Sequence, residues 1–380
     1  MPRITSVQAD CFRIPLPIPV SDSTHGTIAT FQLITARLRD DDGAEGLGYT
    51  FTVGQGGLAI NSLLRHELTD LLVGENTPEI EDFWRRMWWH LHWIGRGGTA
   101  SFAMAAVDIA LWDLEARRAG LPLWKHLRTS VDWLTPLDTP PVVRPYAGGI
   151  DLEYPLEQLL EQTRGHLAGG FQAIKMKVGR PRLAQDVDRV AAMRELLGPD
   201  IPLMVDANMR WTVEEAIAAA RALRDFDLVW LEEPTAPDDW DGHARIAADG
   251  GLPLAAGENL HTVAEFRELI TRGGVSYPEP DVATVGGITP WLEVARLAGD
   301  HGLPTTTHGV HDLHVHLLAA IESASYLEVH GFGLDRFIAD PLVIEAGQAL
   351  VPIGPGHGIE LDWDRLSRHR EHPGSNPTEA

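Results

Sequence analysis

The chain of 380 residues is long enough for two or three domains, one of which has room to be a complete barrel. Acidic residues outnumber basic ones by 54 to 31, and the net charge of −23 argues against a surface for nucleic acid or anionic membranes. The hydrophobic share of 44% and the charged share of 22% are ordinary for a globular protein, so neither disorder nor a membrane class is favoured.

The start of the chain, MPRITSVQADCFRIPLP, alternates polar and apolar side chains and lacks the continuous apolar region of a secretion signal. It therefore predicts a first strand. Cys11 is the only cysteine, which excludes an internal disulfide and a thiolate metal cluster within one chain. A reducing, cytoplasmic location fits this cysteine usage.

Residues 1–130 mix strand and helix patterns. The runs ITSVQADCFRIPL and FQLITARLRD are strand-like, and DDGAEGLG is a turn. The segments SLLRHELTDLL and MAAVDIALWDLEARRAG have helical periodicity, and Gly120 closes the second one. We expect an N-terminal α+β capping domain here.

Residues 143–335 change to short apolar runs that alternate with helical segments, the pattern of parallel βα units. Eight such runs predict an α/β fold, a (β/α)8 (modified TIM) barrel. The expected strands are VRPYAGGI, QAIKMKVG, IPLMVDAN, LVWLEEP, LPLAAGEN, PDVATVGG, LPTTTHG and SYLEVHG.

The C-terminal part holds one short expected strand, PLVIEAGQALVP, followed by GHGIELDWD. We predict that residues 336–366 return to complete the capping domain. Residues 367–380 are polar and contain Pro and Gly, so they predict a disordered tail.

Three carboxylates stand where successive barrel strands should end: Asp206, Glu232 and Glu258. In such barrels the strand C-termini converge on the face that carries the active site. A lone acidic residue there is more often the N-cap of the next helix, but three in register favour a hard divalent cation, and we expect Mg2+. Since side chains alternate along a strand, Glu233 should point elsewhere and form a salt bridge.

Two lysines, Lys175 and Lys177, share one face of their predicted strand because residues i and i+2 point the same way. One reading is that both are exposed on an edge strand, but a closed barrel has no edge. Near each other and near a cation, a lysine should have a lowered pKa and act as a base.

A second candidate base is His308, whose Nδ1 proton Asp281 is placed to accept. In the following helix, His314 and His316 are expected to be packing or surface residues, while substrate contact by His311 stays open. Glu328 at the eighth strand is a candidate hydrogen-bond donor to a substrate carboxylate, which would require a raised pKa.

Bases beside a carboxylate-bound cation suit the removal of a proton from a carbon next to a carboxylate, with stabilisation of the enediolate. Lys177 and His308 would act from opposite faces, and Lys175 would neutralise the substrate carboxylate. A zinc hydrolase is disfavoured, because VRPYAGGI contains no HxH and hard carboxylates suit Mg2+ better than Zn2+.

Together these motifs resemble the enolase superfamily and, within it, the mandelate racemase subgroup, over nearly the whole chain. The resemblance implies a Mg2+-dependent enzyme, commonly a homo-oligomer and often an octamer, with small-molecule acid substrates. It implies that the metal is held by Asp206, Glu232 and Glu258, and it carries the proposed roles to Lys175, Lys177, Asp281, His308 and Glu328.

A finer resemblance, carried by SDSTHGTIATFQLIT, GYTFTVGQGG, WHLHWIGRGG, YAGGIDLEYPL and THGVHDLHVHL, is to 3,6-anhydro-L-galactonate cycloisomerases. It implies that capping loops near residues 21–27 and 52–57 set specificity, as mobile lids in which His25 bonds a sugar hydroxyl. Cycloisomerisation, dehydration of a simple sugar acid, racemisation of a 2-hydroxy acid and non-catalytic binding of a sugar acid all remain open at this point.

Overall fold

The N-terminal part of the chain is a three-stranded antiparallel sheet covered by helices. The computed structural model describes residues 2–76, 79–330 and 332–372. The sheet has the order β1 (Ile4–Asp22), β2 (Gly26–Asp40) and β3 (Glu45–Thr52). Its helices are α1 (Gly57–Leu63), a π-helical turn (Leu64–Leu68), α2 (Thr69–Leu72), α3 (Ile80–Leu91), α4 (Thr99–Arg118) and α5 (Leu123–Ser130).

Helix α4 is the centre of this unit and is buried on nearly all sides. Its many alanines let neighbouring backbones approach closely. Gly46 and Gly48 on β3 lie directly against it, where a Cβ would come within 2.1 Å of the Ala110 carbonyl oxygen and 2.0 Å of that of Ala106. The helix predicted from residue 104 is part of this element.

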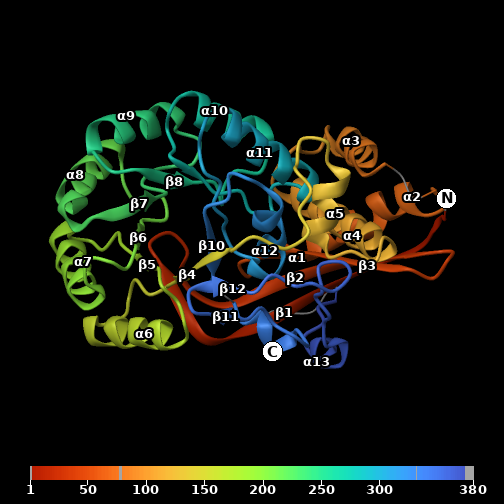
Figure 1. The fold of residues 1–380 in the computed structure, drawn as a ribbon, viewed down its shortest axis with the longest axis horizontal. Helices are drawn as coiled ribbons and strands as arrows, with labels where there is room; N and C mark the ends of the chain where they lie inside the picture. The colour runs from red at the N-terminus through yellow and green to blue at the C-terminus, as the bar shows by residue number, and fades with distance from the viewer. Residues whose placement is uncertain (1, 77–78, 331, 373–380) are drawn as a thin grey trace.

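The second part is a barrel of parallel strands surrounded by helices (Figure 1). Its strands are β4 (Arg144–Gly148), β5 (Ile174–Lys177), β6 (Leu203–Asp206), β7 (Leu228–Glu232), β8 (Leu254–Ala256), β9 (Tyr277–Pro278) and β10 (Tyr326–Val329), and β10 pairs with β4. Its helices are α6 (Leu156–Ala168), α7 (Leu183–Leu197), α8 (Val213–Leu223), α9 (Trp240–Gly250), α10 (Val263–Thr271), α11 (Ile288–Asp300) and α12 (His311–Ala320).

Two of the eight expected strands are wrong. The run 280–287 is a series of turns, and the strand lies before it as β9; prolines at 278 and 280 have no N–H to extend a ladder. The run 303–309 forms no strand in the described chain. It nevertheless fills the gap between β9 and β10, because Thr305 forms an isolated bridge with Ala324 and the Thr306 N–H donates to the Pro278 oxygen at 3.0 Å.

The barrel interior below its mouth is filled with aromatic side chains. The Trp230 ring centroid lies 5.6 Å from that of Tyr146, 5.0 Å from that of Tyr277 and 5.8 Å from that of Tyr326. This layer closes the bottom of the barrel, so the charged groups above it can be reached only from the C-terminal ends of the strands.

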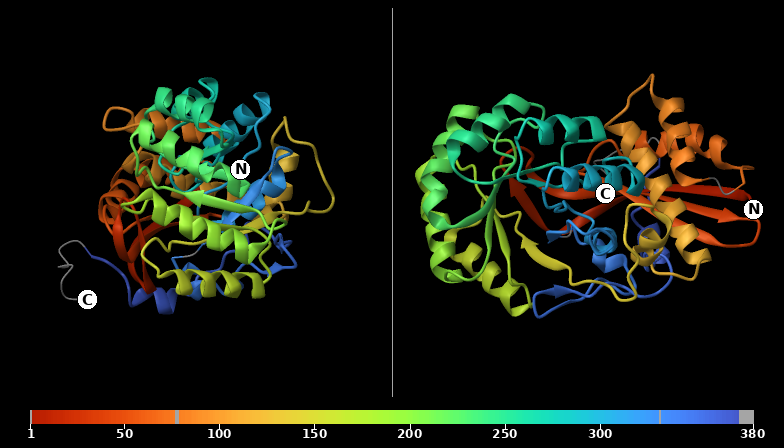
Figure 2. Two further views of the ribbon diagram at one scale, coloured as in Figure 1. Left: turned by 90° about the vertical axis from the view of Figure 1, so that its left-hand side faces the viewer. Right: turned by 45° about the horizontal axis from the view of Figure 1, so that its top comes forward.

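The C-terminal segment runs back over the first unit (Figure 2). It contains a short hairpin of β11 (Ile344–Glu345) and β12 (Gln348–Ala349), where one strand was expected, and helix α13 (Trp363–Ser367). The His357 Nε2–H donates to the Leu47 carbonyl oxygen at 2.7 Å. Arg370 pairs with Asp10 at 2.7 Å, so the beginning of the expected disordered tail is fixed by contacts.

The rest of the predicted tail, residues 373–380, lies outside the described residues, and the predicted domain boundaries stay predictions. Within the described ranges, no helix combines the length and apolar character needed to cross a membrane.

Candidate active site

Three carboxylates, two of them buried and the third partly exposed, meet at the mouth of the barrel. The strand register pairs Lys177 with Asp206 and Asp206 with Glu232, so these side chains lie at the same level. Glu258 follows β8 and offers an oxygen to the same cluster, where one ligand atom from each carboxylate lies within 4.8 Å of the others. Asp206 and Glu232 are fully buried. Such a set of hard oxygen donors fits Mg2+.

Both lysines of β5 point into this cluster. Lys175 Nζ lies 2.5 Å from Glu232 Oε1, 2.6 Å from Glu328 Oε1 and 3.6 Å from Asp206 Oδ2. Lys177 Nζ forms an ion pair with Asp206. The edge-strand reading is therefore wrong, because both ammonium groups are buried in the barrel mouth.

Among the protein's own groups the pKa of both lysines is raised, and the lowering expected beside a divalent cation stays a prediction. Burial alone would lower the pKa of Lys175, but Glu232, Glu328 and Asp206 outweigh it and raise the value well above its usual range. For Lys177 burial is likewise outweighed, chiefly by Asp206, and the pKa is raised. Carboxylates, rather than the second ammonium group, dominate the surroundings of each lysine.

The pKa values of the two buried carboxylates, Glu232 and Asp206, shift in opposite directions. Burial and the nearby Asp206 raise the pKa of Glu232 to about 8, in spite of Lys175. Burial would raise the pKa of Asp206 too, but Lys177 and Lys175 lower it below its usual value. The Trp230 Nε1–H donates to Glu232 Oε2 at 2.9 Å and fixes the orientation of that carboxylate from below.

Glu233 does not form the predicted salt bridge within the described chain. It is buried, and its carboxylate accepts hydrogen bonds from Asn259 Nδ2 at 3.0 Å. The backbone φ of Glu233 is 40°. Positive φ angles also occur at Asn208 (42°), Met209 (61°) and Val310 (31°). These left-handed conformations are unfavourable for most residues other than glycine; three of the four follow the ends of β6 and β7, and Val310 directly precedes α12.

The Asp281/His308 pair forms as expected. His308 Nδ1 lies 2.9 Å from Asp281 Oδ2, and its Nε2 lies 3.1 Å from Glu258 Oε2. Burial alone would lower the pKa of His308, but Glu258, Asp281 and Glu328 outweigh it and raise the value to about 10. In the strand order, the segment of His308 lies across the mouth from the lysines of β5.

Glu328 occupies the predicted position on β10 but not the predicted protonation state. It contacts Lys175, lies 3.2 Å from His330 Nε2, and accepts from the Gly309 N–H at 2.8 Å. Burial would raise the pKa of Glu328, but His330 and Lys175 outweigh it and hold the pKa well below the usual value. It is therefore a carboxylate rather than a protonated donor.

His330 is a residue of the site that the sequence reasoning missed. Its ring centroid lies 5.4 Å from that of His308, and it reaches Glu328 from the same strand face. The rule of two-residue alternation that placed Lys175 beside Lys177 also places residue 330 beside residue 328. That signal was present in the sequence.

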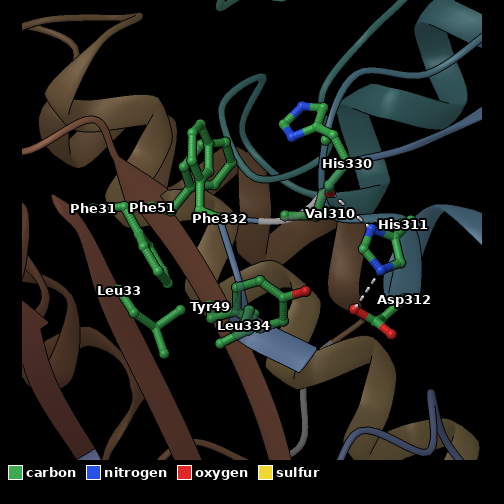
Figure 3. Close-up of a pocket in the computed structure, with 11 residues that line it drawn as sticks. Phe31, Leu33, Tyr49, Phe51, Val310, His311, Asp312, His330, Phe332 and Leu334 are labelled. Atoms are coloured by element: carbon green, nitrogen blue, oxygen red, sulfur yellow. Dashed lines mark hydrogen bonds and ion pairs between the residues drawn. The ribbon is translucent and has the colours of Figure 1, made fainter. Parts of the chain in front are cut away.

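His311 lies outside the cavity of the two bases. Figure 3 shows it beside Asp312, in a neighbouring pocket with Phe31, Phe51 and Phe332. Its Nδ1–H donates to the His330 carbonyl oxygen at 3.1 Å, and its Nε2 lies 3.5 Å from Asp312. Substrate contact by His311 therefore stays a prediction.

The other two histidines of α12 pack in the interior, as expected. The Val282 N–H donates to His314 Nε2 at 3.0 Å, and His316 Nε2–H donates to the His357 carbonyl oxygen at 3.0 Å. Burial lowers the pKa of His314 to about 4 and that of His316 to about 3, so both are neutral and structural.

The turn between β1 and β2 covers the mouth, as Figure 1 shows. Ser23 Oγ donates to the Ala207 carbonyl oxygen at 2.6 Å, Thr24 Oγ1 donates to that of Asn208, and Ser21 bridges to Asp151. These bonds fix the turn to the barrel, which does not fit the expected mobile lid. His25 reaches the cavity that Lys177, Glu258, His308, Glu328 and His330 also line.

The second predicted lid, residues 52–57, is also held by hydrogen bonds. The Arg13 guanidinium donates to the Gly54 carbonyl oxygen at 3.0 Å, and the Gly57 N–H donates to Gln32 Oε1 at 3.0 Å. Val53 and Phe51 line the same cavity and give it an apolar wall opposite the charged groups.

Two family models match the chain. Residues 5–127 match the mandelate racemase / muconate lactonizing enzyme N-terminal domain, and residues 158–365 match the enolase C-terminal domain-like model. A 3,6-anhydro-alpha-L-galactonate cycloisomerase of Streptomyces coelicolor is 52% identical over 96% of this chain and 99% of its own length. An L-talarate/galactarate dehydratase of Salmonella typhimurium is 36% identical over 96% of this chain and 92% of its own length.

Solved structures agree with these matches. A racemase from Streptomyces coelicolor A3(2) with bound magnesium superimposes with a TM-score of 0.92 at 50% identity, over 97% of this chain and 100% of that one. An L-talarate dehydratase from Polaromonas sp. JS666, complexed with Mg and L-glucarate, superimposes with a TM-score of 0.90 at 35% identity, over 98% of each chain.

Proposed function

We propose a function for this chain, which belongs to the mandelate racemase / muconate lactonizing enzyme family of enolase-like enzymes. The protein removes the proton next to the carboxylate of a sugar acid. It then eliminates an oxygen from C3, which gives a 2-keto-3-deoxy acid. The observation that carries this proposal is the placement of two bases, Lys177 and His308, on different sides of one cluster of three carboxylates.

The preferred reaction is the cycloisomerisation of 3,6-anhydro-L-galactonate. The relative with that activity in its name is 52% identical over nearly the whole of both chains. Dehydration of an aldonic or aldaric acid is the second candidate, which the 36% identical dehydratase supports. Both reactions take the C2 proton and expel the C3 oxygen, so one set of residues serves either.

The proposed metal is Mg2+, and Asp206, Glu232 and Glu258 would hold it. The residues fit this ion, because their oxygens converge in a buried cluster with no soft ligand among them. When bound, Mg2+ would supply positive charge that makes the proton beside a carboxylate more acidic. Two of the solved relatives described above carry this metal.

The chain's own groups supply the proton transfers. Lys177 takes the C2 proton from one face, and His308, oriented by Asp281, acts from the other. Lys175 neutralises the substrate carboxylate, and Glu328 holds Lys175 in place while it accepts from the Gly309 backbone. His25 contacts the sugar from the turn above the mouth.

Two other readings use the same geometry. A racemase or epimerase of a 2-hydroxy acid needs only the two opposed bases and no leaving group. A non-catalytic sugar-acid binding protein would bind the same ligand, but it would have no use for the oriented Asp281/His308 pair.

Assembly and location belong to the proposal as well. The family resemblance supports a homo-oligomer, often an octamer, which sedimentation of the purified protein would test. The single cysteine supports a reducing, cytoplasmic location.

The proposal is tested by product identification. The purified protein with Mg2+ is incubated with 3,6-anhydro-L-galactonate and with a panel of aldonic and aldaric acids, and products are identified by 13C NMR. A 2-keto-3-deoxy acid from the anhydro acid establishes the cycloisomerase, and one from a simple acid establishes a dehydratase. Inversion at C2 without elimination would replace both with racemisation.

A further inference from the structure

We propose that His25, held by Asp22, is the general acid that protonates the oxygen leaving C3. This inference rests on the proposed function and extends it, because it assigns the second proton transfer to a residue of the cap rather than of the barrel. The Asp22/His25 pair would thus be a second acid–base pair above the mouth, distinct from Asp281/His308.

The pair is a built arrangement. His25 Nδ1 lies 2.9 Å from Asp22 Oδ2, and the His25 N–H donates to Asp22 Oδ1 at 2.6 Å. The Thr24 N–H donates to the same oxygen at 2.8 Å. The Asp22 side chain is only 6% exposed, whereas that of His25 is 38% exposed. A buried carboxylate therefore orients an accessible imidazole.

The free side of the imidazole is its Nε2. Among the described residues, this atom has no hydrogen-bond partner, and the ring lines the cavity together with Lys177 and His308. The hydrogen bonds of Ser23 and Thr24 to the backbone just after Asp206 hold the turn at a fixed place above the carboxylates. His25 is thus positioned from two sides.

The charge of His25 suits an acid. The hydrogen bond to Asp22 raises the pKa of His25, Glu258 raises it further, and burial and Lys177 only partly oppose them. The ring is exposed enough to take up a new proton from solvent after each turnover.

Each of the other titratable nitrogen groups in the described cavity is paired with a carboxylate of the barrel mouth. Lys177 pairs with Asp206 and His308 with Glu258, so both bases address the carbon nearest the carboxylate cluster. His330 is paired with Glu328 at 3.2 Å, and burial lowers the pKa of His330. His25 is the remaining titratable donor of this described cavity.

The proposed step balances as follows. After a base has taken the C2 proton, the electron pair on C2 forms the C2–C3 double bond while the C3–O bond breaks. The departing oxygen keeps the bonding pair and takes the proton from His25 Nε2. In the anhydro acid it becomes a tethered hydroxyl group, and in a simple sugar acid it leaves as water. The enol then takes a proton at C3 and releases the proton of its C2 hydroxyl group to solvent, which gives the 2-keto-3-deoxy acid.

The experiment separates proton removal from elimination. His25→Gln is incubated with Mg2+ and 3,6-anhydro-L-galactonate, or with the panel acid that the wild type converts, in deuterated water. We expect product formation to fall by about 100-fold or more, while deuterium accumulates at C2 of the recovered substrate. Asp22→Asn should shift the same ratio of exchange to elimination in the same direction by about 10-fold, because the imidazole loses its orientation.

A substrate analogue tests the acid role directly. Fluoride leaves as an anion without a proton, so the 3-deoxy-3-fluoro analogue should be eliminated by His25→Gln at close to the wild-type rate. The matched control is His90→Gln. His90 pairs with Glu67 at 3.1 Å and is equally exposed at 38%, but it lies on α3, outside the cavity. His90→Gln should keep the wild-type ratio of C2 exchange to elimination.

Three results would overturn the inference. His25→Gln could lose C2 exchange and product formation equally, or it could keep both. It could also fail to eliminate fluoride from the fluoro analogue at close to the wild-type rate. Each result would mean that His25 donates no proton to the leaving oxygen. Failure of the proposed function itself is distinguishable, because the wild type would then show no exchange at C2 of any acid tested.

Discussion

Between β4 and β8 the barrel is built from paired strands, whereas the gap between β9 and β10 is filled by a segment joined through one isolated bridge and a few hydrogen bonds. In the first half, strand register alone puts Lys177, Asp206 and Glu232 at one level. In the second half, the Asp281/His308 pair stands on turns whose geometry depends on local bonds, such as that of the Gly309 N–H to Glu328. The first half gives the metal cluster and one base, Lys177, and the second half gives the other base, His308.

The largest effects should come from removing one base from each half. Lys177→Ala in the strand half and His308→Asn in the turn half should each reduce kcat by about 1,000-fold or more, because a general base contributes about 100- to 10,000-fold. Steady-state kinetics measure the loss, and circular dichroism checks that the fold is kept. Near-normal activity in either variant would mean that its half supplies no base.

Next in size is the loss of a metal ligand in the strand half. Glu232→Gln keeps the shape of the side chain but removes a negative charge from the cluster, so the Kd for Mg2+ should rise by about 100-fold. Isothermal titration calorimetry measures this change. Unchanged Mg2+ affinity would remove Glu232 from the proposed ligand set.

A smaller effect should come from the residue that orients Glu232. Trp230→Phe removes the Nε1–H that donates to Glu232 Oε2 and keeps most of the aromatic packing. Partners behind metal ligands typically contribute 10- to 100-fold in affinity, and we expect about 10-fold here because Glu232 keeps Lys175 nearby. A Kd equal to that of the wild type would show that strand register alone positions the carboxylate.

The last effect concerns stability rather than activity, through the attachment of the turn half to the cap. Asp108 on α4 accepts from the Thr289 N–H at 2.9 Å and from Thr289 Oγ1 at 2.6 Å. Burial, opposed by these bonds, raises the pKa of Asp108 to about 7. Between about pH 4 and 7 the folded protein therefore holds a proton that the unfolded chain has released, and this contribution to the free energy of unfolding is lost as the pH rises through 7.

Asp108→Asn should remove this pH dependence. The wild type should lose up to about 1.4 kcal/mol of stability per pH unit relative to the variant across that range. Urea unfolding of both proteins at a series of pH values measures the difference. Parallel stability curves would mean that Asp108 is ionised throughout and does not hold α4 to α11 as a protonated group.

Sequence reasoning succeeded where strand geometry decides the outcome and was weaker elsewhere. Alternation and even spacing placed Lys177, Asp206 and Glu232 at one level, because register transmits position from strand to strand. It misplaced the sixth strand, since prolines end the pairing after two residues. The pairing of Asp281 with His308 was nevertheless predicted, because the two residues follow neighbouring positions around the barrel.

Charge states were the least predictable feature. The raised pKa expected for Glu328 is not found, and the lysine pKa values are raised by the surrounding carboxylates, because each value depends on how many opposite charges surround the group in space. His330 lies in that environment and was not considered. The fixed position of the turn at residues 21–27 depends on bonds to residues 207 and 208, which no local pattern of Gly and Thr reveals.

The most direct test of the central claim is proton exchange at C2 in deuterated water, followed by 1H NMR with and without Mg2+. The account predicts that the wild type with Mg2+ removes the C2 proton of a sugar acid, and that a chelator or the double change Lys177→Ala and His308→Asn abolishes this exchange. Exchange that persists in the double variant, or no exchange by the wild type with any acid, would contradict it.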